Sequence, residues 1–332
     1  MRKKILGSVF ACGVLLSVCS CSNGNAAATI ENPPITTGLK PTLGEAKKVD
    51  LEEVDTVKLP LDSYLPTNGE NATLQRAEAE SINSCMKKLG YTKNPVPVLP
   101  VAANGVRDFR TGWFVVTKEE AEKYGYDSPP DTASDRRATK DNAWQKKRTK
   151  LQDALMGGAI KTFYGKSVPA GGCLGGSSRK MTAGAPLGST TILAGGMKMK
   201  ASDGDFAARG YLEMHIQAAR NELTLQVEKS TRWKSLAKSW SDCMAKSGYH
   251  YDSPVDAMTD KRWSGPADKQ ERAAAEADAA CKDDVNFLGT MISLHTAYEN
   301  SFIQQNQKFL KKLRTEYGRW LKNARSIVDA AS

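Results

Sequence analysis

The side chains able to act as acids, bases or metal ligands are few and scattered in this 332-residue chain. The histidines are His215, His250 and His295. A general base or a metal ligand can be built on any of them. However, His215 and His295 fall on apolar helical faces, where histidine is usually packed in the core, and His250 next to Asp252 is typical of a turn. We therefore predict no catalytic histidine.

Two short motifs resemble parts of catalytic sites. Gly165-Lys166-Ser167 is similar to the end of a phosphate-binding loop, but Ile160 stands where that loop needs its first glycine. Ser177-Ser178-Arg179-Lys180 is the nearest approach to a nucleophile beside a lysine, and the other residues of such a set are missing. The sequence predicts neither an enzyme nor a cofactor.

Tryptophans at helical spacing could line a groove for a sugar or a peptide, but such residues more often belong to the core. These are Trp233, Trp240, Trp263 and Trp320. We expect them to be core residues.

The cysteines divide by position. Cys12 and Cys19 lie in an N-terminal signal, and Cys21 ends it. The remaining four, an even number, are typical of disulfides formed in an oxidising compartment, and they allow three pairings. They are Cys85, Cys173, Cys243 and Cys281. The chain has no C-x-x-C spacing and three histidines, so we predict no metal site.

The first twenty-one residues predict export and lipid attachment. Arg2, Lys3 and Lys4 precede a short apolar stretch over 5–18, and a small residue, Ser20, stands immediately before Cys21. This pattern is typical of a lipoprotein signal, in which the cysteine becomes the acylated first residue; the stretch is too short for a spanning helix. We expect the mature chain outside the cytoplasm, attached to the cell membrane by lipid at Cys21.

The chain is basic, with a formal net charge of +10 at pH 7. Removing the three positive residues of the signal leaves 10 − 3 = +7. A basic protein outside the cytoplasm is attracted to anionic lipid headgroups or wall polymers, although lysine and arginine also simply solvate helices. Nucleic acid is not an expected partner there.

Four regions are expected from composition and periodicity. Residues 1–20 are the signal peptide, and 21–70, small, polar and rich in proline, form the lipid anchor and a flexible tether. Residues 71–204 form a first disulfide module that contains strand-like residues over 106–116 and a mobile Gly-rich loop over 157–204. Residues 205–332 form a long helical hairpin.

An internal duplication supports a particular pairing of the cysteines. Apolar residues predict a helix over 74–89, capped at its start by Asn71 or Thr73 and ended by Gly90. Its end, Cys85-Met86-Lys87-Lys88-Leu89-Gly90-Tyr91, aligns without gaps with Cys243-Met244-Ala245-Lys246-Ser247-Gly248-Tyr249. If each copy is one disulfide unit, the pairs are Cys85–Cys173 and Cys243–Cys281.

The last third predicts two long helices. Residues 205–247 lack proline, and after Pro266 an apolar stripe continues to the C-terminus as a helix of about 60 residues, near 90 Å if unbroken. Pairing Cys243 with Cys281 makes them antiparallel, with residue 243−k facing residue 281+k. The predicted fold is mainly α, with disulfide-pinned helical modules and a long antiparallel helical hairpin at the C-terminus.

The second copy resembles a group of uncharacterised secreted lipoproteins of actinobacteria. The resemblance covers about residues 230–325 and depends on Trp240-x-x-Cys243-Met244, Gly248-Tyr249, the Ser253-Pro254 turn, where Ser caps the next helix, and Ala277-Asp278-Ala279-Ala280-Cys281. It implies lipid anchoring and disulfides, and it gives no information on activity.

These features favour a non-enzymatic lipoprotein that binds an envelope partner, either an anionic wall polymer or a protein. A substrate-binding lipoprotein of a transporter is the first alternative, although no repeated strand–helix alternation supports it. A cell-wall-modifying enzyme is the second alternative.

Overall fold

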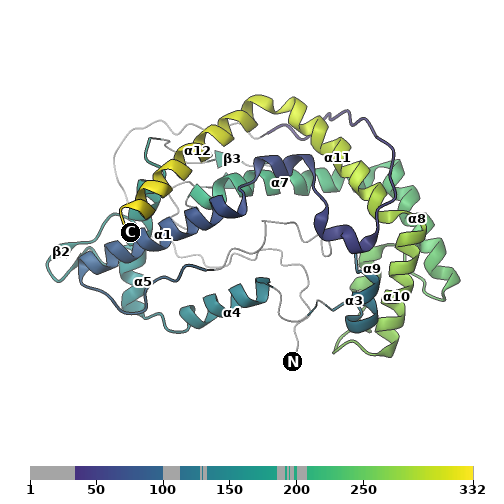
Figure 1. Ribbon diagram of the computed structural model, residues 1–332, viewed down its shortest axis with the longest axis horizontal. Coiled ribbons are helices and arrows are strands. Elements are labelled where there is room, and N and C mark those ends of the chain that lie inside the picture. The colour runs from purple at the N-terminus through teal and green to yellow at the C-terminus, as the bar shows by residue number, and fades with distance from the viewer. Residues whose placement is uncertain are drawn as a thin grey trace.

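The computed structural model describes residues 34–99, 113–127, 129, 133–184, 191–192, 194, 198–199 and 208–331. These residues are mainly helical, as predicted. The signal sequence and Cys21 lie outside the described residues. Figure 1 shows an arc along one edge of the molecule, made by α10, α11 and α12 in chain order, with α7 inside the arc and α8 beside α10.

The elements before the C-terminal third are short helices and one small hairpin around one long helix. They are η1 (Leu51–Thr56), η2 (Pro60–Tyr64), α1 (Asn68–Leu89), α3 (Lys118–Tyr124), α4 (Ala133–Gln145), α5 (Lys150–Gly157), β1 (Thr162–Phe163), β2 (Lys166–Ser167) and α6 (Gly172–Met181). Strands β1 and β2 are antiparallel.

A second antiparallel hairpin and the C-terminal helices follow. They are β3 (Thr191–Ile192), β4 (Lys198–Met199), α7 (Ala208–Lys229), α8 (Thr231–Lys246), α9 (Pro254–Met258), α10 (Lys269–Asp284), α11 (Phe287–Gln305) and α12 (Gln307–Asp329).

The C-terminal hairpin forms in the expected register. The rings of His215 in α7 and Phe309 in α12 lie 5.2 Å apart. These two positions are 243 − 28 and 281 + 28, so the relation drawn from the disulfide holds 28 residues away from it. The register drifts by a few residues elsewhere, since Trp233 of α8 contacts Phe287 of α11 at 5.8 Å.

The expectation of one uninterrupted helix of about 60 residues is wrong. Asn286 adopts a left-handed conformation between α10 and α11, and Asn306 separates α11 from α12. The first arm breaks too, at Ser230, whose hydroxyl accepts a hydrogen bond from the Trp233 amide and caps α8. The apolar stripe continues through these positions, so periodicity alone does not reveal the breaks.

The expectation of a flexible tether up to residue 70 allowed for partial order over 51–61, where η1 and the start of η2 form. It is wrong over the rest of residues 34–70, which lie against the helices or within η2 and α1. We call residues 34–50 the strap. It runs antiparallel to α11, and helix side chains bind its backbone. Asn306 accepts from the Ile35 amide and donates to the Ile35 carbonyl, both at 2.8 Å.

Further along the strap, polar side chains of α11 and its flanking asparagine continue this recognition. Ser301 accepts from the Lys40 amide at 3.0 Å, Ser293 donates to the Gly44 carbonyl at 2.9 Å, and Asn286 donates to the Ala46 carbonyl at 2.9 Å. A Cβ at Gly289 would lie 1.9 Å from the Lys47 carbonyl oxygen. The strap therefore lies directly against the helix backbone there, which only glycine allows.

The Gly-rich segment over 157–204 is ordered where it is described, contrary to the mobile loop expected. Gly172 begins α6, and the buried Cys173 follows it. A Cβ at Gly158 would lie 2.3 Å from the Gly172 amide nitrogen, and a Cβ at Gly172 would lie 2.1 Å from the Met156 carbonyl oxygen. These glycines let the end of α5 and the start of α6 meet.

Other local predictions had mixed outcomes. Helix α1 ends at Gly90 as expected, but Thr67 and Glu70 form its N-terminal capping box, so the cap at Asn71 or Thr73 is wrong. The described part of the strand-like stretch, 113–116, is a turn and irregular chain with Trp113 buried. Ser253 caps α9 as predicted.

The first and second modules are not separate bodies. One core cluster joins Leu74 of α1, Met181 of α6, Leu223 of α7 and Trp320 of α12. Figure 1 shows α12 lying along α1. The chain boundary expected at residue 204 therefore does not divide the hydrophobic core.

Both disulfides join segments that are distant in sequence, so their loss should destabilise the fold. For Cys243→Ala/Cys281→Ala, with a separation of 38 residues, we expect a loss of about 4 kcal/mol in the free energy of unfolding, because the unfolded chain regains loop entropy. Chemical denaturation with and without reductant measures it. An unchanged midpoint would contradict this account; reduced wild type is the control.

Candidate functional site

The two cysteine corners have the same local structure, which supports the internal duplication. Gly90 and Gly248 are both left-handed, with φ of 98° and 83°. The Tyr91 amide donates to the Met86 carbonyl at 2.9 Å, and the Tyr249 amide donates to the Met244 carbonyl at 3.0 Å. Each helix thus ends in the same reversed turn.

The disulfides are those expected from the duplication. Cys85 pairs with Cys173, and Cys243 pairs with Cys281; the Cα–Cα distance is 5.6 Å in both. Each pair links the last turn of one helix, α1 or α8, to a later helix, α6 or α10. Covalent attachment therefore fixes where the chain turns back in each copy.

Side chains at equivalent positions of the two copies bind the segment that follows each turn. Asn83 accepts from the Val96 amide at 2.8 Å and donates to the Val96 carbonyl at 2.9 Å. Ser241, the matching residue, donates to the Tyr251 carbonyl at 2.6 Å. A hollow lies beside each of them, of about 150 Å³ in the first copy and 330 Å³ in the second.

The two hollows have opposite charge and are not typical small-molecule sites. Lys87 and Lys93 line the first, whereas Asp252 and Asp256 line the second together with His250. Small-molecule sites usually measure about 300–1,000 Å³ and are mostly apolar. The first hollow is smaller than this range, and the second is open and lined by polar residues. We therefore read both as consequences of the turn.

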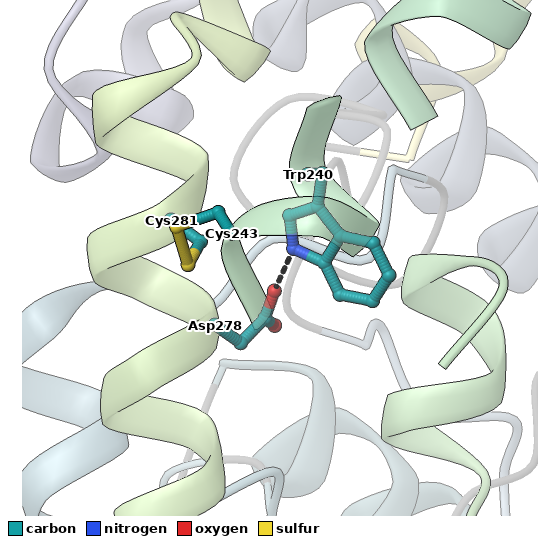
Figure 2. Close-up of a disulfide and its surroundings, with 4 residues drawn as sticks. All are labelled: Trp240, Cys243, Asp278 and Cys281. Atoms are coloured by element: carbon teal, nitrogen blue, oxygen red, sulfur yellow. Dashed lines mark hydrogen bonds between the residues drawn. A yellow bond between two sulfur atoms is a disulfide. The ribbon is translucent and has the colours of Figure 1, made fainter. Parts of the chain in front are cut away.

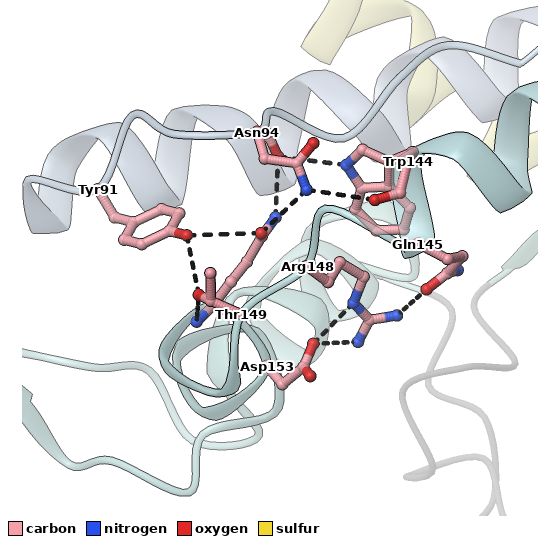
Figure 3. A network of polar contacts seen from close by, with 8 residues as sticks. Tyr91, Asn94, Trp144, Gln145, Arg148, Thr149 and Asp153 are labelled. Atoms are coloured by element: carbon pink, nitrogen blue, oxygen red, sulfur yellow. Dashed lines mark hydrogen bonds and ion pairs between the residues drawn. The ribbon is translucent and has the colours of Figure 1, made fainter.

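A polar network fills the first corner (Figure 3) and satisfies itself internally. The Gln152 amide donates to the Asn94 carbonyl at 2.8 Å, and the Asn94 amide donates back to the Gln152 side chain at 3.2 Å. The Tyr91 hydroxyl lies 3.2 Å from Thr149 Oγ1, and the Trp144 indole donates to the Asn94 carbonyl. This network attaches α4 and α5 to the corner.

The second corner contains a buried ion pair next to its disulfide (Figure 2). The Trp240 indole donates to Asp278 Oδ1 at 2.7 Å. The Lys282 ammonium donates to Asp278 Oδ2 at 2.7 Å, with both side chains fully buried, and to the Phe114 carbonyl. Burial raises the pKa of Asp278 and lowers that of Lys282. Neither group is open to a substrate, so the pair is structural.

The histidines and tryptophans lie mostly where the sequence predicted. His215 and His295 are buried, and the His295 ring lies 5.0 Å from that of Trp113. Trp240, Trp263 and Trp320 are core residues, and Trp233 is half-buried. His250 is exposed at the second corner.

The two motifs similar to catalytic sequences take part in ordinary structure. Tyr164 and Gly165 form the turn between β1 and β2, so Gly165-Lys166-Ser167 belongs to a hairpin. Ser177 is buried in α6. Within the described ranges, no group of three or more His, Cys, Asp or Glu side chains is arranged to hold a metal ion. No helix in the part of the chain that the structure describes is long and apolar enough to cross a membrane.

A chemically distinctive surface that the sequence did not reveal is the outer face of α12. Its exposed cations are spaced one to seven residues apart along about 25 Å of helix. They are Lys308, Lys311, Lys312, Arg319, Lys322 and Arg325. The half-buried Glu316 lies 3.8 Å from the Lys312 ammonium. We call this set of six the basic face.

The end of α6 extends the basic face. The Asn323 amide donates to the carbonyls of Met181 and Ala183, both at 2.9 Å, which places the last turn of α6 against α12. Arg179 and Lys180 in that turn are exposed. The spacing of the cations within 308–325 was readable in the sequence, but only the burial of the opposite face shows that they share one surface.

Comparison of the chain with protein-family models, curated proteins and solved structures found no match. The function must therefore be argued from the residues themselves.

The buried pair predicts a strong asymmetry between single and double substitutions. Lys282→Met should destabilise the fold by about 3–5 kcal/mol, because it leaves the Asp278 carboxylate buried without its charge partner. Asp278→Asn/Lys282→Met should recover most of this loss, since the amide oxygen still accepts from Trp240. Urea denaturation measures both.

The matched control for this cycle is the exposed pair Lys238–Asp242, which has the same i,i+4 spacing and side chains 75% and 60% exposed. Lys238→Met should cost less than about 1 kcal/mol. Equal losses at the two sites would show that the buried pair has no special role.

A second titrating cluster lies beside the second corner and predicts a pH dependence. Hydrogen bonds from Arg262 hold the pKa of Asp260 at about 2, and burial together with the bond to Asp260 raises the pKa of Tyr251 to about 12. The folded pKa of Asp260 is below the unfolded value near 3.9, so its stabilisation is complete above about pH 4 and is lost as the pH falls toward 2.

NMR titration of the Asp260 carboxyl checks the first value, and a titration near pH 4 would contradict it. In Asp260→Asn the pKa of Tyr251 should fall below 12, because the neighbouring negative charge is gone, while burial still holds it above its ordinary value.

Proposed function

We propose that the protein is an extracytoplasmic lipoprotein, attached to the membrane by lipid at Cys21, that binds an anionic partner of the cell envelope and is not an enzyme. The two disulfides are consistent with an oxidising compartment. The export signal and the resemblance of its second copy to secreted actinobacterial lipoproteins support the same location. An anionic wall polymer is the preferred partner, and an acidic protein surface is the other.

The observation that carries this proposal is the basic face of α12. Its cations project from one rigid helix, which packs on α1, α6 and α7 through Leu313, Tyr317 and Trp320. A polyanion can contact several such cations at once, and the summed attraction is long-ranged and decreases with salt. Because the helix is fixed in the core, its backbone loses little conformational entropy when a polymer binds.

The alternatives lack a specific supporting observation. A transporter's substrate-binding protein needs an enclosed cleft of ligand size between two lobes. The hollows at the two corners are a small one and an open one, and a third of about 520 Å³ beside α4 is also open. An enzyme needs an accessible set of reacting groups. Of the candidates from the sequence, Ser177, His215 and His295 are buried, and His250 is exposed in the open second hollow.

The test is binding of the soluble ectodomain, residues 22–332 with disulfides formed, to isolated cell walls with and without their anionic polymers. We expect binding that is lost on removal of the polymers and decreases with salt. Neutralising the basic face with Lys308→Gln, Lys311→Gln, Lys322→Gln and Arg325→Gln should weaken binding at least tenfold, on the order of a few tenths to one kcal/mol per charge.

The matched control removes four exposed lysines elsewhere on the chain, with the same change in net charge. These are Lys234→Gln, Lys246→Gln, Lys261→Gln and Lys269→Gln. Equal weakening by the two variants would show that net charge, not the basic face, is responsible. Absence of binding at low salt would overturn the polymer as partner.

A further inference from the structure

The strap begins where the proposed anchor must reach the folded body. Cys21 and Pro34 are separated by 34 − 21 = 13 residues, which span at most about 45 Å when extended. Asn306 binds both backbone groups of Ile35 at the start of α12. The point of attachment therefore lies at the junction of α11 and α12, within reach of the membrane.

Exposed apolar side chains lie along the strap and beside its start. Ile35 is 55% exposed and Leu43 is 43% exposed, both on the strap. Leu225 of α7 is 50% exposed, and its neighbour Gln226 donates a hydrogen bond to the Thr36 carbonyl, which places Leu225 beside the start of the strap. The other large exposed apolar residues within the described ranges are Val98, Leu151 and Tyr164, in the first module.

The way the strap is held explains why these side chains face outward. Side chains from α7, α11 and Asn306 bind its backbone, and its own Leu39 and Val49 pack on the core clusters, which leaves Ile35 and Leu43 facing outward. Lys40 is exposed on the strap between Ile35 and Leu43 in the sequence, and Lys308 is exposed two residues after Ile35's partner Asn306. Exposed apolar residues mixed with lysines are typical of a surface that rests on an anionic membrane interface.

We infer that the strap face, made of Ile35, Leu43 and Leu225 with Lys40 and Lys308, rests on the bilayer that holds the lipid anchor. Its apolar side chains enter the headgroup region, and its lysines lie near anionic lipid headgroups. This inference rests on the proposed acylation of Cys21. The anchor keeps the strap face close to the membrane, so a contact that is weak for a free protein is sufficient.

The experiment uses the full acylated protein reconstituted in vesicles of phosphatidylcholine and phosphatidylglycerol. Ile35→Cys, in a chain whose described cysteines are all in disulfides, provides a thiol for an environment-sensitive fluorophore, and Leu151→Cys is the matched control. We expect a blue shift and at least a twofold rise in emission at residue 35, and no change at residue 151.

The effect should depend on the neighbouring apolar residues and on charge. With the fluorophore at residue 43, Ile35→Ser/Leu225→Ser should remove at least half of the blue shift, whereas Val98→Ser/Leu151→Ser should leave it unchanged. Vesicles of phosphatidylcholine alone should give a smaller shift.

Mass spectrometry of the N-terminal peptide shows whether Cys21 is acylated, and this result distinguishes failure of the proposed anchoring from failure of the proposed membrane contact. If Cys21 carries no lipid, both the anchoring and the strap face are overturned. If Cys21 is acylated and the fluorophore at residue 35 does not respond to vesicles, the strap face alone is overturned. A response that requires added cell wall would assign this face to the wall and would also overturn its placement on the bilayer.

Discussion

The register of the C-terminal hairpin is the constraint on which the rest of the structure depends, and two buried ionic clusters define it. Near its closed end, Trp240 and Lys282 bind Asp278 beside the disulfide of Cys243 and Cys281. Farther along, Arg220 pairs with Glu299 at 3.3 Å and also with Asp62 of η2. The second carboxylate oxygen of Glu299 accepts from the Leu61 amide at 2.8 Å. Apolar stripes can slide by a turn at little cost, but a slip here would leave buried charges unpaired.

Both clusters also recruit segments from outside the hairpin. Lys282 binds the carbonyl of Phe114, and the Tyr126 hydroxyl donates to the Ala274 carbonyl at 3.4 Å, so the segment around α3 is attached to α10. Glu299 and Arg220 hold η2 in the same way. The hairpin therefore forms the frame of the structure, and charged groups buried in it bind the irregular segments that cross its surface.

The elements that follow a helical period or an internal repeat could be predicted from the sequence. The segments whose conformation depends on contacts with residues distant in sequence could not. The cysteine pairing, the Gly90 and Gly248 turns and the antiparallel register followed from the duplication, because matching residues build matching turns. The prediction of a flexible tether was wrong because the strap has little periodicity of its own. Polar residues 240 or more positions away, such as Asn286 and Ser293, bind its backbone. The helix breaks at Asn286 and Asn306 were not predicted for the same reason. Each asparagine binds the strap backbone as well as ending or beginning a helix.

The basic face could be predicted only in part for a different reason. Net charge is a property of composition and indicates attraction to anions, but a surface requires knowledge of which side of α12 is buried. Leu313, Tyr317 and Trp320 face the core, and this leaves Lys308, Lys322 and their neighbours on the opposite side. The strap joins this helix at its first turn through Asn306. If the proposed anchor at Cys21 holds the chain to the membrane, a polyanion bound along α12 would contact the same rigid element that the strap joins. Force on the polymer would then pass toward the membrane through the Asn306–Ile35 contact and the hairpin behind it.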